Sequence, residues 1–234
     1  MKTYQTLLFD IDDTLLDFQA SEAFALQALF DAQQIPLTDD IKLQYQVINQ
    51  GLWKAFEEEQ ISRSQVLNTR FSLLFEAYGQ QVDGALFEKK YRTYLNQGHH
   101  LISGAFSLIQ TLQQDYDLYV VTNGVSKTQY QRLTDAQLLP LFKDVFVSED
   151  TGYQKPMKEY FDYVFNRIPH LVLDKTLIIG DSLTSDIQGG NLAGIDTCWF
   201  NPHSLANPTS FIPTIEIQQL SELLTLLKPD KTSI

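Results

Sequence analysis

The chain has 234 residues, 44% of them hydrophobic, and a formal net charge of −12 at pH 7. So acidic a chain excludes long nucleic acids and anionic membranes as partners, because both bind to basic faces. No apolar run reaches the ~20 residues of a membrane span. Acidic residues interrupt the N-terminal apolar run where a signal peptide would continue, so we expect a cytoplasmic protein. For its oligomeric state we expect a monomer or a homodimer.

The first predicted element is a buried strand over residues 6–9, which ends in the acidic cluster Asp10-Ile11-Asp12-Asp13-Thr14. Unpaired carboxylates this close together repel one another, and burying them is costly unless a cation compensates. The cluster therefore predicts a metal site, carboxylate chemistry, or both. Asp13 is interpreted as a turn residue, and the Thr14 hydroxyl is expected to satisfy polar groups of the loop.

We expect a helical insertion over residues 17–97, because the next convincing strand after residues 6–9 begins only near Leu118. One apolar face has the i, i+3, i+4, i+7 spacing of a helix: Phe71, Leu74, Phe75 and Tyr78. A second and a looser third face are suggested by Ala23, Leu26 and Phe30, and by Val47, Leu52, Trp53 and Phe56. Arg70 and Arg92 are interpreted as solvated charges, with the alternative that an arginine facing the cleft selects the substrate. Residues 17–20 and 98–104 are the expected hinges.

Four further strands are predicted after the insertion, each short and apolar: 118–121, 145–147, 176–179 and 197–200. Helical patterns lie between them at 105–114, 126–138, 157–167 and 185–193. This alternation is typical of a Rossmann-like, doubly wound parallel α/β sheet. We therefore expect a core domain of residues 1–16 and 98–234 and a cap domain of residues 17–97. The single cysteine, Cys198, is expected to be a small buried residue of the last strand.

Polar clusters follow three of these strands: Thr122-Asn123-Gly124, Lys155-Pro156 and Gly180-Asp181, with Asp186 five residues further on. The carboxyl ends of adjacent parallel strands share one edge of a sheet, where ligands bind, so these side chains can converge with Asp10 and Asp12. Carboxylate oxygens suit Mg²⁺, a carboxylate can attack phosphorus, and a second carboxyl can transfer protons.

These four motifs, in this order along the whole chain, resemble those of the haloacid dehalogenase (HAD) superfamily of phosphohydrolases, and the insertion resembles the helical cap of its subfamily I. The resemblance implies that Asp10 is the nucleophile, Asp12 the general acid and base, and Lys155 the cationic partner of Asp10 and of the substrate phosphate. It implies that Thr122 and Asn123 bind the phosphoryl group. It also implies a Mg²⁺ held by Asp10, by Asp181 and by the backbone carbonyl of Asp12, with Asp186 as a supporting or direct ligand. Asp186 could instead cap the following helix.

Within the superfamily, Asp12 favours phosphoryl transfer over dehalogenation, because the dehalogenases lack this second aspartate. The segment 180–194 and the Thr122-Asn123-Gly124 motif are similar to the house-cleaning pyrimidine 5′-nucleotidases, which implies nucleoside monophosphates such as UMP, dUMP and dTMP as substrates. Two alternatives stay open. One is a phosphatase or mutase for another metabolite, such as phosphoglycolate or a sugar phosphate. The other is a phospho-accepting protein that does not hydrolyse.

Overall fold

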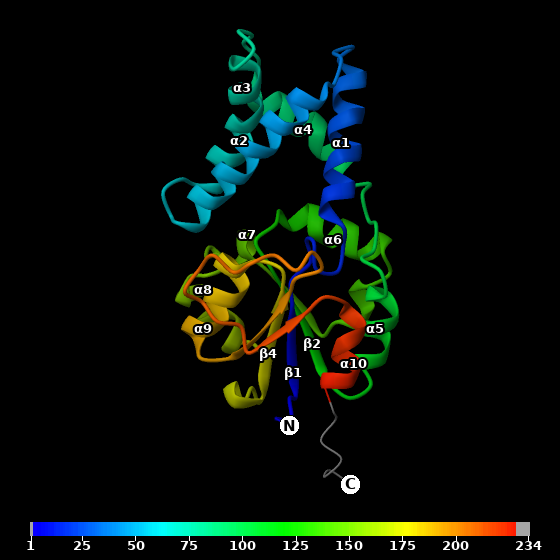
Figure 1. Ribbon diagram of the computed structural model, residues 1–234, viewed down its shortest axis with the longest axis vertical. Helices are drawn as coiled ribbons and strands as arrows, with labels where there is room; N and C mark the ends of the chain where they lie inside the picture. Colours follow the sequence, from blue (N-terminus) through cyan, green and yellow to red (C-terminus); the bar gives the residue numbers. More distant parts are fainter. Residues whose placement is uncertain (1, 228–234) are drawn as a thin grey trace. The chain divides into compact units, whose positions relative to one another are not determined.

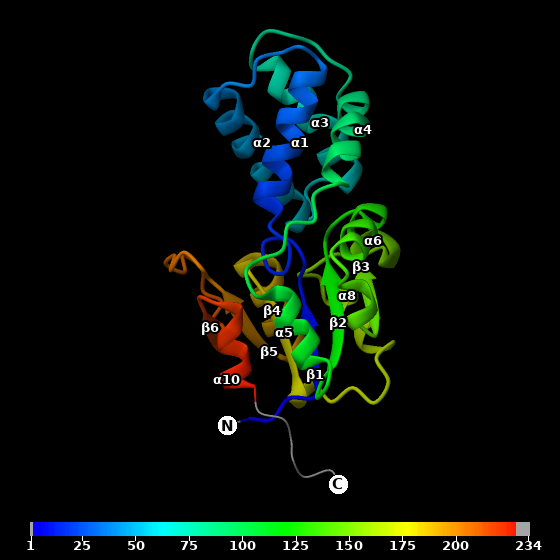
Figure 2. The same ribbon diagram turned by 90° about the vertical axis from the view of Figure 1, so that its right-hand side faces the viewer.

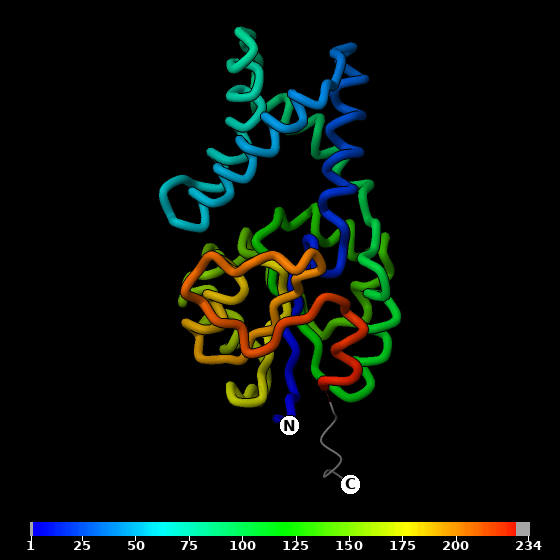
Figure 3. Tube along the Cα trace, viewed as in Figure 1, coloured from blue at the N-terminus to red at the C-terminus, as the bar shows by residue number. Residues whose placement is uncertain are grey.

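The computed structural model describes residues 2–227 and contains two compact units (Figure 1). One comprises Met1–Phe18 with His99–Ile234, and the other Gln19–Gly98. Figure 3 traces the chain out of the first unit and back again. The second unit covers nearly the same residues as the predicted insertion. Within residues 2–227, no helix combines the length and the apolar character that crossing a bilayer demands.

The first unit is built on a six-stranded parallel sheet with the order β3-β2-β1-β4-β5-β6 (Figure 2). Its strands are β1 (Thr6–Phe9), β2 (Asp117–Thr122), β3 (Asp144–Val147), β4 (Thr176–Gly180), β5 (Asp196–Phe200) and β6 (Ile215–Ile217). Phe9 is in register with Val120 of β2 and Ile179 of β4, so β4 ends one residue and β2 two residues beyond the end of β1. The predicted fold class is confirmed. Strand β6 was not predicted, because only three residues pair and one of them is exposed.

Helices cover both faces of this sheet because successive strand residues point to opposite sides. Leu7 and Phe9 pack in a cluster with residues of α5 (Ala105–Leu112) and α10 (Leu223–Leu226). Leu8, between them, packs in a second cluster with residues of α8 (Lys158–Phe165). Figure 1 shows α8 and α9 (Gln188–Ala193) on one side of the sheet and α5 and α10 on the other. Cys198 is buried in the first cluster, as expected.

The remaining helical elements of this unit are short: α6 (Ser126–Asp135), η1 (Leu139–Leu141), α7 (Ser148–Thr151), η2 (Leu173–Lys175), η3 (Leu183–Ile187) and η4 (Leu220–Glu222). The helix expected over 126–138 ends earlier, at Asp135, because Gln137 adopts a left-handed conformation with φ 58°. The helix expected over 185–193 begins earlier, as the π-helical turn η3, which leads directly into α9.

The segments that leave and rejoin the first unit are paired with each other. Leu16 and Leu101 form an antiparallel bridge. Asp17 N–H donates to the carbonyl of His100 at 2.8 Å, and Ile102 N–H donates to that of Leu15 at 2.9 Å. The two crossings are therefore held side by side by main-chain hydrogen bonds.

The second unit contains only helices: α1 (Phe18–Ala32, whose first residue belongs to the first unit), α2 (Asp39–Glu57), α3 (Arg63–Glu76) and α4 (Gly84–Leu95). Three of them begin at a side-chain cap that accepts from the first turn, namely Thr38, Ser62 and Asp83. An aromatic cluster fills the interior: Phe30, Tyr45, Phe71, Phe75, Phe87 and Tyr91.

Several expectations for the insertion are wrong in detail. Phe71, Leu74 and Phe75 are buried as predicted, but Tyr78 is exposed and its hydroxyl donates to Asp40. Ala23 and Val47 are exposed as well, because α1 and α2 turn other residues inward. The buried set is Ser21, Ala25, Leu26, Leu29 and Phe30 on α1, and Tyr45, Asn49 and Phe56 on α2.

Arg70 is not a solvated charge, contrary to the prediction. Its side chain is buried and forms an ion pair with Glu88, and its Nη1 donates to Asn49 Oδ1 at 3.1 Å. Glu88 also pairs with Arg92, one turn away on the same helix. A buried guanidinium is stable only when its donors are bonded, so this cluster forms part of the interior of the second unit.

Candidate active site

The register of the sheet brings the predicted site residues to one edge. Asp10 follows β1, and its N–H donates to the carbonyl of Ile179 in β4 at 2.9 Å. Thr122 is the last residue of β2, and Asp181 follows β4 directly. β1 and β4 flank the point where the strand order reverses, which is where open α/β sheets bind ligands.

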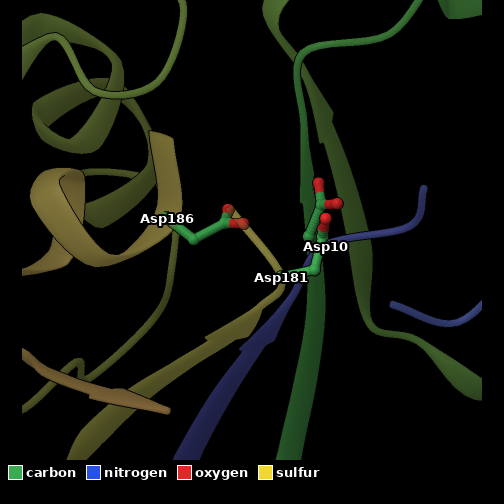
Figure 4. Close-up of side chains that lie close together, drawn as sticks. All are labelled: Asp10, Asp181 and Asp186. Atoms are coloured by element: carbon green, nitrogen blue, oxygen red, sulfur yellow. The ribbon is translucent and has the colours of Figure 1, made fainter. Parts of the chain in front are cut away.

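Three carboxylates meet at this point: Asp10, Asp181 and Asp186 (Figure 4). Each offers an oxygen, and the three oxygens lie within 4.8 Å of one another. Asp10 and Asp186 are buried, and Asp181 is partly buried. Oxygen donors this close, with no nitrogen or sulfur among them, fit a hard divalent cation.

Lys155 is the cation that the chain itself supplies to this cluster. Its buried ammonium donates to Asp10 Oδ1 and Asp186 Oδ1, both at 2.6 Å, and to the carbonyl of Val121 at 2.8 Å. Burial acts to lower the pKa of Lys155, but the carboxylates of Asp10 and Asp186 outweigh it and hold the pKa above its ordinary value. One ammonium faces three carboxylates, so the cluster retains an excess of negative charge.

The pKa values of Asp10 and Asp181 are raised by burial together with the excess negative charge. Burial, with the neighbouring charges of Asp186 and Asp12, raises the pKa of Asp10 to about 8 even though Lys155 opposes the shift. Burial and the charge of Asp10 likewise raise the pKa of Asp181 well above its ordinary value. Without a further cation, the folded protein therefore takes up protons that the unfolded chain would release.

We expect the metal-free protein to lose stability as the pH rises from about 4, the ordinary value of an aspartate, to about 8. Both raised pKa values make the folded state bind more protons than the unfolded state, so the free energy of unfolding falls with pH across this window. Lys155 stays charged throughout and adds no slope. Thermal unfolding in EDTA at several pH values measures the effect, and Asp10→Asn should flatten it. A stability that rises across the window in the wild type would contradict this prediction.

Asp186 is held at both oxygens. Oδ1 accepts from Lys155, and Oδ2 accepts from Ser182 N–H at 3.1 Å. It lies inside η3, whose N-cap is Ser182, so the alternative that Asp186 caps this helix is wrong. A Cβ at Gly180 would come within 2.1 Å of Asp186 Oδ2, so a side chain there would displace this carboxylate.

Asp181 is positioned from both sides. Its Oδ1 accepts from the Thr14 hydroxyl at 3.2 Å, and its carbonyl accepts from Trp199 Nε1 at 2.8 Å. Asp13 has a left-handed backbone, with φ 54°, and its Oδ1 accepts from Phe18 N–H at 3.0 Å. Asp13 is therefore a turn residue, as the sequence predicts, whereas the Thr14 hydroxyl bonds to a carboxylate outside its own loop and helps to position Asp181.

Thr122 and Asn123 have different partners. Thr122 Oγ1 accepts from Gly124 N–H at 3.2 Å and from Gln129 Nε2 at 2.9 Å, so its own proton can be directed to another acceptor. The Asn123 amide donates to the carbonyl of Lys155 at 2.9 Å and accepts from its N–H at 2.8 Å. The Asn123 side chain thus positions Lys155, and its predicted contact with phosphate stays a prediction.

Asp12 has two partners that the sequence interpretation missed. Gln129 Nε2 donates to Asp12 Oδ2 at 2.8 Å, and Arg132 Nη1 forms an ion pair with Oδ1. Both partners lie on α6, directly after the Thr122 motif. The sequence does hold a signal for these two partners: Gln129 and Arg132 are spaced i, i+3, so they lie on the face of α6 that also carries the buried Leu133.

Fold and site together define a doubly wound α/β protein with an acidic, oxygen-rich centre at the switch point of its sheet. The chain belongs to the haloacid dehalogenase-like hydrolase family, whose family model matches residues 7–200. This confirms the resemblance that the four motifs indicated.

Individual relatives are similar over almost the whole chain. YfnB of Bacillus subtilis, named as a HAD-hydrolase, is 63% identical over 232 residues, which are 99% of each chain. Its crystal structure, bound to magnesium and revealing interdomain movement, matches with a TM-score of 0.93 over 97% of this chain and 100% of that one. The pyrimidine 5′-nucleotidase PynA of Streptococcus pneumoniae is 44% identical, covering 96% and 95% of the two chains. The pyrimidine 5′-nucleotidase YjjG of Escherichia coli is 30% identical, covering 94% and 96%.

Proposed function

We propose that this protein is a Mg²⁺-dependent phosphomonoesterase that hydrolyses pyrimidine nucleoside 5′-monophosphates such as UMP, dUMP and dTMP. The observation that carries the proposal is the buried Asp10 carboxylate, held by Lys155 inside an acidic cluster sized for one cation. The names of PynA and YjjG, which are similar along nearly their whole lengths, support the choice of substrate.

The reaction we assign has two steps. Lys155 holds Asp10 Oδ1, so Oδ2 is the oxygen that attacks phosphorus. As the bond from Oδ2 to phosphorus forms, the bond to the nucleoside 5′ oxygen breaks, and Asp12 protonates that leaving oxygen. Asp12 then takes a proton from water, which attacks the aspartyl-phosphate and releases inorganic phosphate.

The surrounding groups bind and neutralise the phosphoryl oxygens. The Thr122 hydroxyl is the donor that we assign to this role, with Asn123 beside it. The three N–H donors of Lys155 are bonded to Asp10, Asp186 and the carbonyl of Val121, so Lys155 contributes to phosphate binding through its positive charge. Mg²⁺ would be held by Asp10, by Asp181 and by the backbone carbonyl of Asp12, with Asp186 in support. The metal would supply positive charge to the phosphoryl group.

We also propose that residues 17–97 act as a cap domain over a catalytic core of residues 1–16 and 98–234. The crystal structure of YfnB, described as revealing interdomain movement, supports this division. In such an arrangement the core performs the chemistry, and the cap excludes water and selects the substrate.

A phosphatase panel tests the proposal. With Mg²⁺, we expect UMP, dUMP and dTMP to be hydrolysed in preference to AMP, uridine 3′-monophosphate, phosphoglycolate and sugar phosphates. EDTA should abolish the activity, and added Mg²⁺ should restore it, because one lysine cannot neutralise both the cluster and a phosphate dianion. Phosphate release measures both effects. A sugar phosphate as the best substrate would overturn the choice of substrate, and a stable phospho-Asp10 with no turnover would point to a phospho-accepting protein.

A further inference from the structure

Two polar side chains on α6 are buried without belonging to the acidic cluster. Gln129 is 1% exposed and Arg132 is 0% exposed. They are spaced i, i+3 and therefore lie on one face of the helix. The Arg132 guanidinium also lies over the Phe18 ring, 5.6 Å from its centroid. Burying a guanidinium and an amide is costly unless their donors are bonded, so their partners reveal their role.

The main partner of both side chains is Asp12. Arg132 Nη1 pairs with Oδ1, and Gln129 Nε2 donates to Oδ2 at 2.8 Å, so each carboxylate oxygen has its own donor. The same Nε2 donates to Thr122 Oγ1 at 2.9 Å. A single amide nitrogen thus links Asp12 to the Thr122 hydroxyl.

Arg132 also fixes which way the Gln129 amide points. Its Nη1 donates to Gln129 Oε1 at 3.0 Å, and a guanidinium has no acceptor. Gln129 must therefore present its carbonyl to Arg132 and its NH₂ group to Asp12 and Thr122. The orientation follows from the hydrogen-bonding chemistry of the partners.

Gly124 provides the space that this arrangement needs. A Cβ at this position would lie 2.4 Å from Gln129 Nε2 and 2.6 Å from its Cδ. The obstructed group is the end of a flexible side chain, so an alanine here would move Gln129 rather than the backbone.

We propose that Gln129 and Arg132 are positioning residues that hold the Asp12 carboxylate at a fixed place relative to the Thr122 hydroxyl. The inference rests on the proposed function, in which Asp12 transfers protons and Thr122 binds the phosphoryl group. A proton donor must lie within hydrogen-bonding reach of the leaving oxygen, and a misplacement of about 1 Å can cost roughly 10²-fold in rate. Gln129 and Arg132 act through Asp12 and need not touch the substrate.

Three variants test this role: Gln129→Leu, Arg132→Met and Gly124→Ala. Gln131→Leu is the matched control, because Gln131 is exposed on the same helix and its side chain donates to Asp135, away from Asp12. Because Asp12 also serves the second step, which is the same for every ester, the rate of phospho-Asp10 formation is measured by quenched flow on UMP and on p-nitrophenyl phosphate, whose leaving group departs without a proton. We expect this first-step rate on UMP to fall about 10- to 100-fold, and the loss on p-nitrophenyl phosphate to be much smaller. Asp12→Asn should show the same contrast more strongly.

Gly124→Ala keeps the experiment decisive if Arg132→Met fails to fold, because the three atoms nearest to its added Cβ all belong to the Gln129 side chain. Equal losses in the first-step rate on both esters, or first-step rates like those of Gln131→Leu, would overturn the inference while leaving the proposed function intact. A wild-type protein that hydrolyses neither ester in Mg²⁺ would overturn the proposed function and this inference with it.

Discussion

Asp10→Asn is expected to abolish hydrolysis of UMP. Asparagine keeps the shape of the side chain and can still accept from Lys155, but it removes the oxygen that attacks phosphorus. Loss of a covalent nucleophile costs on the order of 10⁴- to 10⁶-fold in kcat. Steady-state phosphate release measures the rate, and mass spectrometry after acid quenching detects the phosphoryl adduct on Asp10 in the wild type and its absence in the variant.

Asp13→Asn is the matched control for this experiment. Asp13 lies three residues further along the same loop, and its Oδ1 accepts from Phe18 N–H, a bond that an amide carbonyl also makes. Its activity should stay near that of the wild type. If Asp10→Asn turned over at the wild-type rate, or if the adduct appeared on another residue, the assignment of Asp10 as nucleophile would be wrong.

The second large effect is expected from Lys155→Met, which should lower both stability and activity. It leaves the buried carboxylates of Asp10 and Asp186 without their cation. Removing one partner of a buried ion pair typically costs about 3–5 kcal/mol, because the remaining charge is uncompensated. Denaturant unfolding in EDTA measures the loss, and UMP hydrolysis in Mg²⁺ measures the activity.

Lys158→Met is the control for this variant, because Lys158 pairs with Asp162 on an exposed helix surface and such pairs contribute little. Adding Asp10→Asn to Lys155→Met should recover part of the lost stability, since one of the unpaired charges is then gone. A Lys155→Met protein as stable as Lys158→Met would show that the cluster does not depend on its lysine.

The chemistry-bearing residues could be predicted because strands and their ends leave strong local signals. Asp10, Thr122 and Asp181 each follow a short apolar run directly, and a parallel sheet gathers such positions at one edge. Lys155 is separated from its strand by a loop, so its local signal is weaker, and its place in the order of motifs strengthened it. The resemblance to the HAD family therefore added most where the local pattern was weakest.

The partners of these residues could not be predicted in the same way. Gln129 and Arg132 look like ordinary polar residues of an exposed helix until the fold brings them to Asp12, more than a hundred residues earlier in the chain. Arg70 was misjudged for the same reason, because its partner Glu88 lies on another helix. Burial of a polar side chain depends on tertiary pairing, which periodicity does not encode.

The main-chain hydrogen bonds at Asp17 and Ile102 have a consequence for how such a protein can change. They join the segment that precedes Gln19 to the segment that follows Gly98, so residues 19–98 form one long loop between two hydrogen-bonded ends. Since the loss of chain entropy on closing a loop grows only slowly with its length, such a loop can be shortened, enlarged or exchanged at little thermodynamic cost to the paired ends. The length and sequence of this insertion can therefore change with little effect on the sheet edge that carries the aspartates.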